Sequence, residues 1–156
     1  MEQWWQDGLQ GCLRVISNVE IIKRILCSLI LASLIGLERE KKRQAAGLRT
    51  HVLVSVGSSL IMLISLYIFE LYKNIATLDP ARIAAGVITG IGFLGAGAII
   101  RAGNSVRGLT TAATIWVASG IGLACGCGFF YAAMFVTLVS LIVLLFLRKL
   151  EEYLGK

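Results

Sequence analysis

Charged residues are scarce in this sequence of 156 residues, and their scarcity indicates the class of protein. Only 15% of the residues are charged and 57% are hydrophobic, with a mean hydropathy of +0.82. Soluble domains carry about 25% charged residues. A membrane span needs about 20 apolar residues, so this length allows four to six spans and no large soluble domain. The composition predicts an all-α, polytopic membrane protein.

Residue types that supply catalysis or metal ligands are equally few. His51 is the only histidine, and no serine or carboxylate partner is fixed beside it by sequence. The four cysteines lie in or near apolar segments and form neither a disulfide framework nor a zinc pattern. No Asp or Glu falls in the middle of an apolar run. We therefore expect no enzyme, no resident cofactor and no metal site.

The net charge of +6 raises the question of nucleic-acid binding. The basic residues, however, sit in short loops between apolar runs, where membrane proteins carry their topology signals. We expect the lipid bilayer as the surrounding phase and no nucleic-acid partner.

Apolar runs separated by short charged loops predict five transmembrane helices. Asp79 and Pro80 are a helix-start pair, with Asp as the N-cap, and Gly103 is placed to end the helix that follows. The forty uncharged residues Gly108–Leu147 exceed one span, so we expect a break at Gly126–Gly128. The transmembrane domain, residues 21–147, is expected to have spans at about 21–37, 52–69, 81–100, 108–125 and 129–147.

The two ends of the chain are predicted to differ. Residues 1–20 carry an apolar stripe at helical spacing behind Trp4 and Trp5, which predicts an interfacial helix, with a flexible tail as the alternative. Residues 148–156 form a short charged tail. Ten Lys and Arg residues fall on one side of the five spans and five on the other. The positive-inside rule then predicts the N-terminus outside and the C-terminus in the cytoplasm, although Lys23 and Arg24 argue against it.

The most distinctive stretch is glycine-rich. Gly90–Gly95 matches the dinucleotide-binding pattern G-x-G-x-x-G, but it lies inside an apolar run and no acidic residue follows before Glu151. Small residues four apart, such as Gly86 and Gly90, instead let membrane helices approach closely. We expect packing against neighbouring helices, a second copy or another integral membrane protein.

Charges at the span ends allow two interpretations. The simpler one is interfacial anchoring. The alternative is a polar cluster in which Glu38 pairs with an arginine, because a lone charge at the bilayer centre costs about 2.5–3.5 kcal/mol on insertion scales. In the predicted topology Arg101 and Arg107 lie at the same side of the membrane as Glu38 and would supply that arginine.

Five segments together resemble the MgtC/SapB family of bacterial inner-membrane proteins, over about residues 20–147. They are Leu37-Glu38-Arg39-Glu40, Ala46-Gly47-Leu48-Arg49-Thr50-His51, Asp79-Pro80-Ala81-Arg82-Ile83-Ala84, Gly90-Ile91-Gly92-Phe93-Leu94-Gly95-Ala96-Gly97 and Val106-Arg107-Gly108-Leu109-Thr110-Thr111-Ala112-Ala113-Thr114-Ile115-Trp116. The resemblance implies a multi-pass protein of the bacterial cytoplasmic membrane, linked to magnesium homeostasis and low-magnesium adaptation. Virulence-type members carry a soluble C-terminal domain and tend to have Asn at the position of Thr110, so we expect the short form of the family.

The resemblance also supplies the candidate functional residues. They are Glu38, Arg39, Arg49, Thr50, His51, Asp79, Arg82, Gly90, Gly92, Gly95, Gly97, Arg101, Arg107, Gly108, Thr110, Thr111 and Thr114. Two functions remain open. The first is modulation of another membrane complex; the second is transport of Mg²⁺ or protons as a carrier or channel. The predicted span interiors offer only hydroxyls, which counts against a carboxylate-lined path but leaves carbonyls at a helix break near Gly90–Gly97.

Overall fold

The computed structural model describes residues 16–75, 77, 79–103 and 105–147 as five helices and one β-hairpin. The elements are α2 (Asn18–Lys41), α3 (Leu48–Tyr72), α4 (Ala81–Gly97), β1 (Ile100–Ala102), β2 (Ser105–Arg107), α5 (Leu109–Cys127) and α6 (Phe130–Ile142), which the π-helix η1 (Val143–Leu147) continues. The predicted interfacial helix within residues 1–20 falls almost entirely outside the described residues, as does the predicted tail at 148–156.

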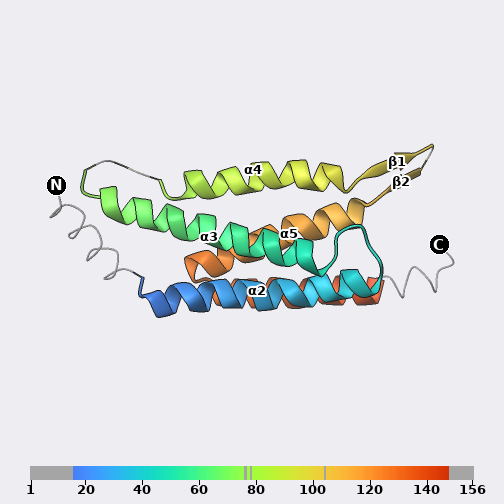
Figure 1. The fold of residues 1–156 in the computed structure, drawn as a ribbon, viewed down its shortest axis with the longest axis horizontal. Helices are drawn as coiled ribbons and strands as arrows, with labels where there is room; N and C mark the ends of the chain where they lie inside the picture. Colours follow the sequence, from blue (N-terminus) through green and yellow to red (C-terminus); the bar gives the residue numbers. More distant parts are fainter. Residues whose placement is uncertain (1–15, 76, 78, 104, 148–156) are drawn as a thin grey trace.

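The helices run alternately in opposite directions and form an elongated bundle (Figure 1). We call the end where α2, α4 and α6 begin the Asn18 end, and the opposite end, where α3 and α5 begin, the Lys41 end. The most extensive contact joins α3 to α5, and α2 packs on both. Helix α4 lies along one side of this group, and the hairpin projects from it at the Lys41 end (Figure 1).

Within the described residues, three helical segments are long and apolar enough to cross a membrane: α3, α5, and α6 together with η1. Helix α4 is apolar but has only 17 residues, and α2 is 24 residues long with charges near both ends. The prediction of an all-α membrane protein is confirmed.

Two glycines bring α3 and α5 very close together. A Cβ atom added at Gly122 would overlap the carbonyl oxygen of Ser55, and one at Gly126 would lie 2.6 Å from the carbonyl oxygen of Ser59. Two glycines four positions apart therefore bring the two backbones together, as expected for membrane helices. The break predicted just after this pair is present, because α5 ends at Cys127 and Gly128 caps it with a left-handed φ of 88°.

The third predicted span is shorter than expected. Helix α4 ends at Gly97 instead of residue 100, and the chain then forms the antiparallel pair β1–β2, in which Arg101 faces Val106. Gly103, predicted to end the helix, instead has a left-handed φ of 60° at the hairpin turn. The apolar run stops at Arg101, so extended pairing outside the helical bundle replaces the last helical turn.

The start of α4 is close to the prediction. The carboxylate of Asp79 accepts a hydrogen bond from the backbone N–H of Ala81 at 2.8 Å. Pro80 occupies the N-cap position, so the N-cap lies one residue later in the chain than expected. The capping chemistry is present with a shift of one residue.

Most of the α4 glycines do not pack against neighbouring helices of this chain, and packing against a second copy or another membrane protein stays a prediction. A Cβ atom added at Gly86, Gly90, Gly92 or Gly97 would meet nothing within 4 Å, and only Gly95 faces a neighbour, Ala112, at 3.7 Å. Helix α4 contacts the bundle mainly through buried Val87 and Ile91 instead. Most of its glycines therefore leave open surface within this chain.

Candidate functional site

A cluster of buried polar side chains lies at the Lys41 end, where α2 meets the beginning of α3. Helix α2 comes very close to α3 at Gly36, where an added Cβ would lie 2.8 Å from the Cα of Leu48. The carboxylate of Glu40 accepts a hydrogen bond from the Leu48 N–H at 3.0 Å, which satisfies one free donor at the N-terminus of α3. These contacts fix the last turn of α2 against the first turn of α3.

Glu38 and Arg39 form a buried ion pair in that last turn. They are only 8% and 5% exposed, and the Arg39 Nε donates to the Glu38 Oε2. The second carboxylate oxygen, Oε1, is buried without a hydrogen-bond partner. The pair neutralises two charges that would each be costly to bury alone, and it leaves one strong acceptor unused.

His51 and Thr114 connect α3 to α5 in the same region. His51 is fully buried; its Nδ1 lies 2.7 Å from the carbonyl oxygen of Gly47 and its Nε2 lies 3.0 Å from the Oγ1 of Thr114. The Thr114 hydroxyl is also 2.8 Å from the carbonyl oxygen of Thr111. His51 also packs against α2 close to the ion pair, because a Cβ atom added at Gly36 would lie 3.3 Å from the His51 Cβ. The ion pair and this link therefore belong to one cluster.

The hydrogen-bond roles in this link follow from the groups present. A carbonyl only accepts, so the Nδ1 of His51 carries a proton, and the Nε2 of a neutral ring is then an acceptor. The single hydroxyl proton of Thr114 is shared between two acceptors, His51 and the Thr111 carbonyl. A proton added to the ring would reverse the first bond and leave the second intact. The link is therefore consistent with a neutral ring whose Nε2 accepts from the Thr114 hydroxyl.

The structure brings together five of the seventeen predicted residues in this cluster, which we call the Lys41-end cluster: Glu38, Arg39, His51, Thr111 and Thr114. The neighbouring candidates Arg49 and Thr110 are exposed, Thr50 is half-buried, and Gly108 holds a left-handed φ of 89° just before α5. The two arginines that were expected to pair with Glu38 do not lie beside it. Arg101 and Arg107 lie on the exposed hairpin, and Glu38 pairs with its own neighbour on α2.

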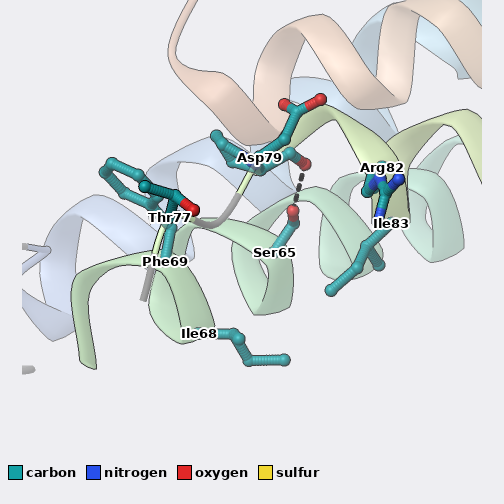
Figure 2. Close-up of a pocket in the computed structure, with 8 residues that line it drawn as sticks. Ser65, Ile68, Phe69, Thr77, Asp79, Arg82 and Ile83 are labelled. Carbon is teal, nitrogen blue, oxygen red and sulfur yellow. Dashed lines mark hydrogen bonds between the residues drawn. The ribbon is translucent and has the colours of Figure 1, made fainter. Parts of the chain in front are cut away.

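Asp79 and Arg82, the remaining charged candidates, lie at the opposite end of the bundle. They line a pocket of about 520 Å³ between the end of α3 and the start of α4. Ser65 lies inside it and donates a hydrogen bond to the Pro80 carbonyl, with Phe69 on one side of that bond and Arg82 on the other (Figure 2). The charged candidates therefore lie at the two opposite ends of the bundle.

Two contributors were absent from the predicted set. Glu40 caps α3, and Ser65 joins α3 to the start of α4. Glu40 stands inside one of the five family-like segments and was therefore within reach of sequence reasoning, whereas no local pattern marks Ser65. Within the described ranges there is no group of three or more His, Cys, Asp or Glu side chains that could hold a metal ion.

Comparison with known proteins shows the family to which this chain is similar. The sequence model of the MgtC family matches residues 25–153. "Putative magnesium transporter YhiD" of Escherichia coli K12 is 43% identical over 129 residues, which cover 81% of this chain and 60% of YhiD. "Protein MgtC" of Salmonella typhimurium strain 14028s is 41% identical over 135 residues, covering 86% of this chain and 55% of MgtC. The chain thus spans less than two thirds of these relatives, and no solved structure matches it.

Proposed function

The chain belongs to the MgtC family, and we propose that it is a multi-pass protein of the bacterial cytoplasmic membrane that serves magnesium homeostasis by modulating another membrane complex. Two relatives support the link to magnesium: one is named a putative magnesium transporter and the other is MgtC. The proposal assigns no chemical reaction and no bound cofactor to the chain.

The hydrogen bonds of the interior hydroxyls favour a modulator over an ion carrier. Seven of the serine and threonine hydroxyls within the predicted spans show how these groups are bonded: six of them donate to backbone carbonyls. They are Ser33, Ser55, Ser58, Thr89, Thr114 and Ser119, and five of them bond within their own helix. The seventh, Ser59, is buried without a partner. Hydroxyls bonded in this way already have a backbone partner and do not form the continuous polar lining of an ion pathway.

The charged residues also favour a modulator over an ion carrier. Mg²⁺ gives up its water reluctantly and prefers carboxylates and octahedral geometry. In the described part of the chain the buried carboxylate is Glu38, which Arg39 already neutralises. A partner-binding role needs only a rigid bundle with exposed lateral faces, and α4 supplies such a face.

Ion flux into liposomes containing the purified protein tests this proposal. Mg²⁺-sensitive and pH-sensitive dyes are trapped inside, and protein-free liposomes give the background. We expect no flux of either ion above that background while the protein remains folded and inserted. A flux that falls in Glu38→Gln, but not in the control Glu70→Gln near the end of α3, would overturn the proposal in favour of a transporter.

A further inference from the structure

Two hollows adjoin on the side of the bundle where α4 meets α3. One is the pocket at the Asn18 end that Asp79, Arg82 and Ser65 line. The other is an open groove of about 720 Å³ between α3 and α4, lined almost entirely by apolar residues and glycine. Ile83 lines both, so the polar pocket and the apolar groove adjoin at this side chain.

Aromatic residues beside the polar pocket indicate the level of a membrane interface. Tyr67, Phe69 and Tyr72 cluster near the end of α3, as aromatic residues do at the headgroup level. Asp79 precedes α4 and Arg82 lies in its first turn, and both residues line the pocket. The pocket therefore offers one carboxylate and one guanidinium where lipid headgroups reside.

The groove has the length of one lipid leaflet. On α4 it runs from Ile83 to Leu94 and on α3 from Ile64 to Leu53, eleven positions in each helix. At 1.5 Å per residue this is about 16 Å, close to half of a hydrocarbon core that is about 30 Å thick.

The floor of the groove is smooth because glycines form it. A Cβ atom added at Gly57, Gly86 or Gly90 would meet nothing within 4 Å, so space remains above each of them. The buried side chains of Val87 and Ile91 close the inner wall. An extended alkyl chain fits such a surface by van der Waals contact alone.

We propose that this surface binds one zwitterionic glycerophospholipid with a primary ammonium, as in phosphatidylethanolamine. Arg82 binds the phosphate, because a guanidinium matches phosphate oxygens with paired donors. Asp79 accepts from the ammonium, since its carboxylate retains acceptor capacity beyond the bond from Ala81. An acyl chain lies along the groove beside Ile83, Gly86 and Gly90.

The charges of the pocket and the length of the groove favour this lipid over other occupants. A choline headgroup has no N–H to donate to Asp79, and a purely anionic headgroup would meet the carboxylate with like charge. A helix from a second copy would use a face of about 20 residues, roughly twice the length of this groove.

Lipid binding to the purified protein in detergent tests the proposal. Native mass spectrometry would compare phosphatidylethanolamine, phosphatidylcholine and phosphatidylglycerol with identical acyl chains. We expect phosphatidylethanolamine to bind about tenfold more tightly than the other two, and Arg82→Gln to lose about tenfold, the size of one charge-assisted hydrogen bond. Asp79→Asn should remove the preference over phosphatidylcholine.

Groove variants test the acyl chain separately from the headgroup. Gly90→Leu should block binding by filling the groove, and Gly57→Leu should do so from α3. Gly92→Leu is the matched control, because Gly92 also has open space but does not line the groove. Equal binding of all three lipids, or unchanged binding in both groove variants, would overturn the proposal. So would full competition by inorganic phosphate, or a dimer that Gly90→Leu abolishes in lipid-free protein.

Discussion

The Nε2 atom of His51 on α3 lies 3.0 Å from the Oγ1 atom of Thr114 on α5, although 63 positions separate the two residues. Both residues are buried, and both stand near the start of their helices at the Lys41 end. The bond therefore links the two helices that share the largest contact of the bundle, and it does so beside the buried pair Glu38–Arg39.

Removing the Thr114 hydroxyl should destabilise the protein. Thr114→Val keeps the shape of the side chain but leaves the Nε2 of His51 buried without its partner. We expect the free energy of unfolding to fall by about 1–2 kcal/mol, measured by denaturant titration in micelles. Thr89→Val is the control: Thr89 bonds to its own helix on an exposed face, and its replacement should change little. Equal losses in both variants would contradict a special role for the link.

The buried ion pair should respond differently to single and double replacement. Glu38→Leu alone leaves the Arg39 guanidinium buried and unpaired, which should cost about 3–5 kcal/mol of unfolding free energy. Glu38→Leu combined with Arg39→Met removes both charges and should recover most of that loss. A double variant as unstable as the single one would show that Glu38 and Arg39 do not compensate each other.

The same double variant separates stability from function. Growth at low magnesium is measured in cells that lack the native protein and carry either form. We expect the double variant to fold and insert but to support growth poorly, if the Lys41-end cluster takes part in modulation. Lys73→Ala, which removes the exposed pair with Glu70, is the control and should grow normally. Full growth of a folded double variant would show that the cluster has only a structural role.

The helices could be predicted from sequence because the bilayer imposes length and apolarity on each span. The break at Gly128 was equally accessible, since glycine is the residue that a left-handed helix cap favours. The hairpin at 100–107 was missed because three-residue strands carry too little alternation to compete with an adjoining helical run. In the Lys41-end cluster, the proximity of His51 to Thr114 depends on how α3 and α5 pack, which no local pattern encodes.

The position of the glycines illustrates the same limit. Gly90 and Gly122 stand in equally apolar segments, each four positions from another glycine, so spacing alone predicts close packing at both. Only Gly122 meets another backbone, because α4 lies at the side of the bundle whereas α5 lies at its centre. Spacing predicts that a helix can pack closely, but the fold decides which helix does.

The orientation of the chain remains a prediction, and cysteine labelling tests it. In a background without native cysteines, Asn74→Cys at the Asn18 end should react with an impermeant reagent in intact cells. Gln44→Cys at the Lys41 end should react only after the membrane is opened. Both positions are exposed in the loops that join the helices, so access depends on the side of the membrane. The reverse pattern would invert the predicted topology.

Two neighbouring glycines on α5 give the sharpest test of the close packing between α3 and α5. Gly122→Ala places a methyl group where the carbonyl oxygen of Ser55 already lies, so the helices must separate and the free energy of unfolding should fall by about 1–3 kcal/mol. Gly120→Ala, two positions earlier, meets nothing within 4 Å. It should be neutral or stabilising by about 0.5–1 kcal/mol, because alanine favours the helix more than glycine does. Opposite signs for the two variants are expected from denaturant titration in micelles. A gain in stability for Gly122→Ala would mean that α3 and α5 are further apart than the structure places them, and the link between His51 and Thr114 would then lose its support.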